Sequence, residues 1–364
     1  MGSWTQTSRL LLMVLAACVL PALRPAGAQD PLFLEPAPLE ESSSPWSGTR
    51  ISEARWYAAA DALMLMRDST PSRPMATLGT LYNDVLNTKD LEAGFQAGAR
   101  VTLGRRLGER HQLEFTWFDL TLWNDRVAVR DESLNDLAGL GNLFSPFTDF
   151  GSPAVPFLDY NYLAEIEYRS ELDNFELNLR QQLPMPPGPF AMSVLVGGRF
   201  MKIRERFYYN AESITPLAMA SSNTVDVRTG NDLWGVQLGA LFEFQVSYRS
   251  KITLDLKGGI FNNIADQGTI YTHSDPLLGA ETYTGFRAEN VTAWAGEITL
   301  ALTYQITPRL TSHAGYQMLW VEGLAQGSGN FEADPLTLAN GPADLNHRGY
   351  AVYHGPHIGM VLRL

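Results

Sequence analysis

Residues 231–261 alternate between apolar and polar side chains with the period of two that is typical of a β-strand. One parity carries Trp234, Val236, Leu238, Ala240, Phe242, Phe244 and Val246, and the other carries Gly235, Gln237, Gly239, Leu241 and Glu243. Residues 248–250 then turn the chain, and the apolar parity resumes at Ile252. Each arm has about a dozen residues, whereas strands of globular proteins usually have about five or six. A soluble sandwich would alternate in the same way, but this length favours a hairpin of a transmembrane β-barrel.

The same alternation predicts about ten strands (a range of 8–12) over residues 55–364. We expect them at 55–67, 94–106, 111–123, 160–183, 190–208, in the two arms of 231–261, and at 290–306, 309–322 and 350–364. In residues 160–183 the apolar parity shifts between Tyr168 and Phe175, which indicates either one strand with a bulge or a small extra hairpin. We expect one strand.

The connections between these strands are alternately short and long. The short ones are 107–110, 184–189, 248–250 and 307–308, and the long ones are 68–92, 124–159, 209–230, 262–289 and 323–349. Outer-membrane barrels have short periplasmic turns and long extracellular loops. The sequence therefore predicts an all-β, antiparallel up-and-down barrel in the bacterial outer membrane.

The first 54 residues precede the predicted barrel. Residues 1–28 read as a cleaved signal peptide, with Arg9, an apolar core and the small residues 26–28 before the cleavage point. Alternatively, residues 15–18 resemble a lipobox that would leave Cys18 as a lipid-bearing N-terminus. Residues 29–54 are rich in Pro and Ser and lack periodicity, so we expect a flexible periplasmic leader.

Charge and cysteine content exclude several classes of function. Removing residues 1–28, with their two arginines, takes the net charge from −12 to −14, whereas nucleic-acid binding needs a basic face. Cys18 is the only cysteine, so the mature chain would have no disulfide, no cysteine nucleophile and no thiolate metal site. We expect no cofactor and no bound metal.

Aromatic residues near the strand ends predict two interfacial girdles. At the long loops these are Trp123, Trp234, Trp294 and Trp320, and at the short turns and the leader they are Trp56, Phe190, Tyr248 and Tyr304. The rings are expected to lie at the two membrane–water interfaces.

The polar parity of the strands is expected to face the lumen. It carries Asp61, Arg100, Glu114, Glu176, Arg180, Arg199, Gln237, Asp255, Lys257, Glu297, His313 and Gln317, together with Gln96 and His357. A barrel of about eight strands leaves room only for side chains, so these residues predict a lumen mostly filled by ion pairs. A narrow conduit for small solutes would use the same residues.

Five short patterns resemble the type 7 β-barrel porin family of bacterial outer membranes, over roughly residues 55–364. They are Trp56-Tyr57 with Asp61, Leu63, Leu65 and Arg67; Glu176-x-Asn178-x-Arg180; Gly197-Gly198-Arg199-Phe200 with Glu205; Asn231-x-Leu233-x-Gly235-x-Gln237-x-Gly239; and His354-Gly355-Pro356-His357-x-Gly359. The resemblance implies an outer-membrane barrel, suggests a porin, and brings no catalytic motif. Such a protein would contact outer-membrane lipid and the barrel-assembly machinery, although it ends in Leu364 rather than an aromatic residue.

Three functions follow as hypotheses from these patterns. The first is an integral barrel for passive permeation of small solutes or for scaffolding the envelope, and the second is a surface-interaction barrel whose long loops bind a partner. The third is a barrel hydrolase, in which His273 with Asp275, or His347 with Asp344, would activate water. No G-x-S-x-G elbow and no H-E-x-x-H pattern is present, so we expect a protein that is not an enzyme.

Overall fold

The computed structural model describes residues 55–68, 72–79, 83–91, 94–131, 141–214, 220–276, 279–340 and 344–364. They belong to one compact unit, residues 42–364. The predicted signal peptide, Cys18 and the predicted leader 29–54 lie outside the described residues.

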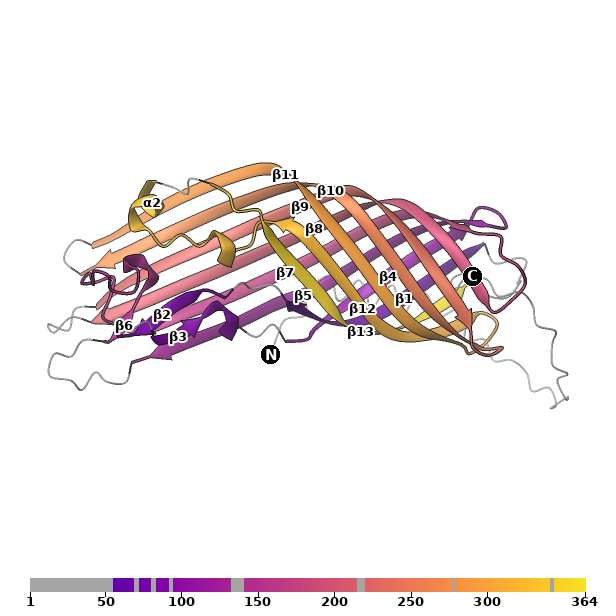
Figure 1. Cartoon of the computed structure of the whole chain (residues 1–364), viewed down its shortest axis with the longest axis horizontal. Coiled ribbons are helices and arrows are strands. Elements are labelled where there is room, and N and C mark those ends of the chain that lie inside the picture. The colour runs from indigo at the N-terminus through magenta and orange to yellow at the C-terminus, as the bar shows by residue number, and fades with distance from the viewer. Residues whose placement is uncertain are drawn as a thin grey trace. The chain divides into compact units, whose positions relative to one another are not determined.

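Ten antiparallel strands close into a barrel (Figure 1). They are β1 (Trp56–Asp68), β4 (Gln96–Arg106), β5 (His111–Arg130), β7 (Asn161–Gln182), β8 (Phe190–Ile214), β9 (Ala220–Gln245), β10 (Ser250–Asp275), β11 (Gly279–Gln305), β12 (Leu310–Leu324) and β13 (Gly349–Arg363). The pairing order is β7-β5-β4-β1-β13-β12-β11-β10-β9-β8, and β8 pairs back with β7. Closure satisfies the backbone N–H and C=O groups that would find no water inside a membrane. The predicted barrel of about ten strands is confirmed.

Two of the five predicted long loops are wrong. β8 continues to Ile214 and β9 begins at Ala220, so most of 209–230 is strand. In the same way β10 continues to Asp275 and β11 begins at Gly279, so 262–289 forms a long hairpin. The short turns all lie at the right end of Figure 1, and these hairpins extend to its left end.

The apolar face of the long strands changes sides along their length. In β8, Val196 points outward and is exposed, whereas Phe207, farther along the strand, points inward and is buried. In β9, Leu238 and Val227 show the same change. Where a strand lies in the membrane, lipid covers its outer face, and that face is apolar. Where the strand extends out of the membrane, water covers its outer face, and the apolar side chains pack on its inner face instead. A strand that crosses this boundary must therefore exchange its apolar and polar parities.

This change also explains the parity shift of residues 160–183. β7 is one strand, and its pairing with β8 runs without interruption from Leu163 to Gln182, so neither the bulge nor the extra hairpin is present there. The bulge lies instead in the neighbouring β5, between Leu120 and Trp123.

Beyond the membrane the barrel opens into a six-stranded sheet. β4 pairs with β5 only as far as Leu120, and β12 pairs with β11 only as far as Trp294. The ends of β5, β7, β8, β9, β10 and β11 beyond this level continue as a curved sheet, which we call the head (Figure 1).

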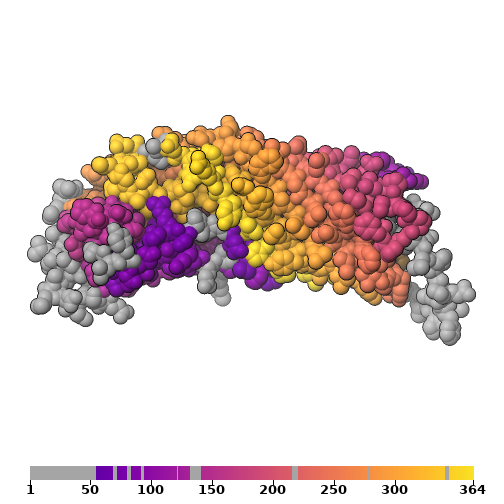
Figure 2. Space-filling model, viewed as in Figure 1, coloured from indigo at the N-terminus to yellow at the C-terminus, as the bar shows by residue number. Residues whose placement is uncertain are grey.

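The connecting segments pack onto the inner face of the head. They contain β2 (Pro74–Leu78), β3 (Asn83–Asn87), η2 (Thr88–Asp90), β6 (Leu143–Phe144), η3 (Pro146–Thr148), η4 (Ser328–Asn330) and α2 (Pro335–Asn340). Met75, Phe147 and Leu338 from these segments join Phe207 and Tyr209 of β8 in one buried apolar cluster. Figure 2 shows the segments gathered at this end of the barrel. Within the described residues, no helix is long and apolar enough to cross a membrane.

We predict that the head faces the outside of the cell. Thr282 lies near the tip of the β10–β11 hairpin, where it pairs with Thr272, and Ser247 lies in a short turn; both are exposed. A membrane-impermeant maleimide added to intact cells should label Thr282→Cys and leave Ser247→Cys unlabelled until the cells are lysed. Labelling of Ser247→Cys alone on intact cells would show that the barrel is inserted the other way.

Candidate functional site

The candidate site is the lumen, because the inward parity of the strands brings the predicted polar side chains together there. All twelve lie inside the barrel: nine are buried, and Arg100, Asp255 and Lys257 are partly buried. They form three adjoining clusters.

The first cluster is centred on Glu176 and Glu297. Lys257 Nζ lies 3.1 Å from Glu176 Oε2 and 3.3 Å from Glu297 Oε1. Arg199 Nη1 lies 2.9 Å from Glu297 Oε2, and Gln237 Nε2 donates to Glu176 Oε2 at 2.9 Å. Two acids thus share two cations, which is the arrangement that makes buried charges tolerable.

The second cluster joins β7 to β5 and β10. Arg180 Nε lies 3.0 Å from Glu114 Oε1, and Arg180 Nη2 lies 3.3 Å from Asp255 Oδ2. The hydroxyl of Tyr57 donates to Glu114 Oε1 at 2.8 Å. Tyr57 was not among the predicted lumen residues, although it shares the parity of Asp61.

The third cluster surrounds Asp61. Arg100 Nε donates to Asp61 Oδ2 at 2.8 Å, and Arg100 Nη1 donates to Gln317 Oε1 at 2.8 Å. His313 Nε2 contacts the other carboxylate oxygen of Asp61. A side chain at Gly359 would place its Cβ only 2.1 Å from that oxygen, so glycine is required for Asp61 to lie there.

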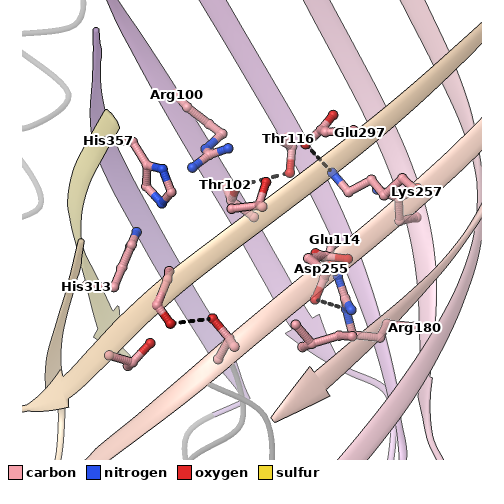
Figure 3. Close-up of a pocket in the computed structure, with 16 residues that line it drawn as sticks. Arg100, Thr102, Glu114, Thr116, Arg180, Asp255, Lys257, Glu297, His313 and His357 are labelled. Atoms are coloured by element: carbon pink, nitrogen blue, oxygen red, sulfur yellow. Dashed lines mark hydrogen bonds and ion pairs between the residues drawn. The ribbon is translucent and has the colours of Figure 1, made fainter. Parts of the chain in front are cut away.

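A polar chamber of about 70 Å³ lies between these clusters (Figure 3). Its wall includes Arg100, Thr102, Glu114, Thr116, Asn178, Arg180, Thr253, Asp255, Lys257, Glu297, Thr299, Thr303, His313 and His357. Arg180 Nη1, Asp255 Oδ1 and His357 Nδ1 are buried without a hydrogen-bond partner among the described groups. Since one water needs roughly 10–15 Å³, the chamber can hold several waters that satisfy these atoms.

An apolar layer closes the lumen above the chamber, and the sequence reasoning missed it. It consists of 17 buried residues from nine strands: Leu63, Leu65, Phe118, Leu120, Trp123, Leu172, Met201, Ile203, Leu233, Phe261, Ala293, Ala295, Leu319, Val321, Leu324, Ala351 and Tyr353. Its sequence signal is the short runs in which both parities are apolar, such as residues 62–66 of β1. In these runs one face meets lipid while the other fills the lumen.

The prediction that Trp123 lies in an interfacial girdle is wrong. Trp123 is 1% exposed and lies in the apolar layer, with its ring 5.5 Å from that of Tyr353. The β5 bulge after Leu120 adds a residue, so the side chain that simple alternation would place outside points inward. The other seven aromatics proposed for the girdles are all exposed: Trp56, Phe190, Trp234, Tyr248, Trp294, Tyr304 and Trp320.

A buried ion pair that was not predicted as a site lies where the lumen meets the head. Arg67 contacts Glu205, and both side chains are almost completely buried. The guanidinium of Arg67 also donates to the hydroxyls of Tyr168 and Tyr353. Arg67 lies on the same side of β1 as Asp61, so strand alternation alone predicts that its side chain points into the lumen.

The histidines proposed for hydrolysis do not form the expected pairs among the described contacts. His273 Nδ1 lies 2.7 Å from the amide oxygen of Asn223, and His347 Nδ1 lies 3.3 Å from Leu345 O and 3.8 Å from Glu289 Oε2. Burial raises the pKa of the neighbouring Tyr271 to about 12, so its phenol stays protonated at neutral pH. Among the described residues, no group of three or more His, Cys, Asp or Glu is placed to hold a metal ion.

The closed ring of strands, the apolar outer wall and the filled lumen define a bacterial outer-membrane β-barrel protein. The model of the family described as Putative beta barrel porin-7 matches residues 56–362, and the chain belongs to this family. Among curated proteins, none matches the chain.

Solved structures of outer-membrane proteins resemble the chain distantly. The outer membrane protease OmpT from Escherichia coli is 10% identical, with a TM-score of 0.45 over 88% of this chain and 100% of that one. A major outer membrane protein from Thermus thermophilus is 8% identical, with a TM-score of 0.30 over 86% and 100%. The Pseudomonas putida toluene transporter TodX is 8% identical, with a TM-score of 0.28 over 85% and 89%. These similarities transfer no activity to this chain.

Adjacent residues of β10 test the assignment of inner and outer walls. Leu254 points toward lipid, whereas Thr253 is buried in the chamber wall. Leu254→Arg should cost about 2–4 kcal/mol of folding free energy, because the charge would enter lipid near the middle of the membrane. Thr253→Arg should cost clearly less, since its guanidinium would reach water and carboxylates. Urea unfolding of both variants in lipid vesicles measures the difference, and equal destabilisation would refute the assignment.

Proposed function

We propose that the protein is a closed outer-membrane barrel that serves as an envelope scaffold and holds its head at the cell surface. The observation that carries this proposal is the apolar layer, which draws side chains from nine of the ten barrel strands. A hydrophobic constriction without water is a barrier to ions and polar solutes, because they would have to lose their hydration.

A second barrier lies in series with the apolar layer. The segments that carry η3, η4 and α2 fill the mouth above it, where Phe331 packs against Phe147, Phe207 and Tyr209. Solute would therefore have to cross both a dry layer and a packed mouth. The clusters of ion pairs below the layer support the same reading, since they link the strands across the lumen.

Passive permeation of small solutes is the second candidate, and the polar chamber favours it. The chamber is lined mainly by polar and charged side chains, which supports a lumen that takes up hydrated polar groups at the end with the short turns. In this reading the apolar layer and the mouth segments would have to move before a solute could pass.

We further propose that the chain reaches the outer membrane as an exported protein, after cleavage before Gln29.

Conductance in planar lipid bilayers tests the scaffold proposal. The purified, full-length protein should give no current steps above the baseline of the bare membrane, because its lumen is closed. Heat-modifiable gel mobility of the same sample should confirm that the barrel is folded, and a porin of known conductance inserted by the same protocol is the positive control. Regular steps of constant size from the folded protein would favour the permeation reading instead.

A further inference from the structure

The head is a sheet with two free edges, because β12 and β4 end where it begins. On one side β12 pairs with β11 only as far as Trp294, so β10 is the only described strand that pairs with residues 279–293 of β11. On the other side β4 pairs with β5 only as far as Leu120. No other described segment makes a backbone–backbone hydrogen bond to residues 279–293. Such an edge presents a row of N–H and C=O groups that a further strand can pair with.

The two edges differ in the features that keep strands of different molecules apart. Proteins protect free edges with bulges, prolines and charged side chains, lysine above all. β5 has its bulge after Leu120, and its free end carries Arg126 and Arg130. In contrast, residues 279–289 of β11 contain no proline and no lysine, and their ladder with β10 runs without a bulge. The edge of β11 is therefore the one that is open to another strand.

Side chains on both faces of this edge are exposed. On the outer face of the head, Phe286 is 63% exposed, and Thr284 beside it is also exposed. On the inner face, Tyr283 packs against the apolar cluster of the head, whereas Glu281 and Arg287 are exposed. A partner strand could thus bury an aromatic ring on one face and meet two opposite charges on the other.

The edge is complementary to itself when two copies run antiparallel about Thr284. A two-fold axis perpendicular to the sheet relates the two strands, so the same surface serves on both copies. In this register Glu281 of each copy lies opposite Arg287 of the other, and opposite charges stabilise a cross-strand pair. Tyr283 lies opposite Gly285, where its ring can cover the space that the glycine leaves. Thr284 lies opposite Thr284 of the second copy.

Only one other register sets a glutamate of this edge opposite its arginine, and the barrel itself blocks that register. Pairing about Ala288 would place Arg287 opposite Glu289. It would also place residues 279–282 opposite residues 294–297, which already pair with β12. The register about Thr284 pairs residues 279–289 with themselves, so every position lies on the free part of β11. Charge and geometry therefore select the same alignment.

We propose that residues 279–289 form a contact surface for a second copy of this chain in a facing membrane, so that the two heads join into one continuous sheet. β11 runs from the head toward the short turns, so antiparallel pairing points the two barrels in opposite directions. Ten residues separate Thr284 from Trp294 in each copy, which places the two Trp294 side chains roughly 65 Å apart along the strands at about 3.3 Å per residue. The inference goes beyond the scaffold function and takes from it only that the head lies at the cell surface.

Cysteine crosslinking of the full-length protein in detergent tests the register. On a Cys18→Ser background, each cysteine introduced is the only one in the chain. Oxidation with copper phenanthroline should link Thr284→Cys into a dimer on a non-reducing gel, because position 284 faces its own copy. Asn290→Cys is the matched control: it is exposed on the same face but lies beyond the paired residues, so it should stay monomeric. Absence of the Thr284→Cys dimer from folded protein, or equal crosslinking of both variants, would overturn the proposal.

Charge reversal tests the complementarity between facing membranes. Vesicles that carry the wild-type protein should cluster, as measured by dynamic light scattering. Arg287→Glu should abolish the clustering, since it sets two acids opposite each other, and the double variant Glu281→Arg/Arg287→Glu should restore it. Arg130→Glu at the other edge of the head is the control and should leave clustering unchanged. Clustering that survives Arg287→Glu, or that the double variant does not restore, would refute self-pairing. Conductance is independent of these results, so their failure would leave the scaffold proposal standing.

Discussion

Lipid surrounds one end of each long strand and water surrounds the other, and the arrangement of side chains follows from this change of solvent. Within the membrane, Val196 and Leu238 face lipid while Arg199 and Gln237 face the lumen. Beyond it, the same strands turn charged residues such as Arg204 and Asp232 outward, where they form an ion pair at 2.9 Å. Because backbone hydrogen bonds continue across the boundary, β8 and β9 remain regular while their apolar faces exchange sides.

The side chains in the lumen are arranged in layers that follow from the same change from lipid to water. Below the boundary the inner wall is polar, and its charges are tolerable because acids and bases alternate around shared partners such as Lys257 and Glu176. At the boundary both walls are apolar, so the inward side chains meet in the apolar layer around Trp123 and Tyr353. Above it, the inward side chains are polar again: Arg67 and Glu205 form an ion pair, and Glu205 accepts a hydrogen bond from Gly327 N.

Strand period, turn length and parity were sufficient to predict the ring of ten strands and the inward direction of residues such as Glu176 and Arg180. They could not predict where lipid gives way to water, so the extensions of β8 and β9 beyond Tyr208 and before Asn231 were read as a loop. The inward direction of Trp123 depends on a one-residue bulge, which alternation in a single strand does not reveal. The pairing of Gly327 with Glu205 joins residues 122 positions apart, and only the folded barrel brings them together.

The central claim is that water fills the chamber and stops at the apolar layer, and two alanines of β11 test it most directly. Ala301 lines the chamber and Ala295 lies in the apolar layer, and both point inward from the same strand. In the folded barrel, a small charged methanethiosulfonate reagent should modify Ala301→Cys and leave Ala295→Cys intact over the same time. Equal rates of modification at the two positions would show a continuous column of water through the lumen and would contradict the account.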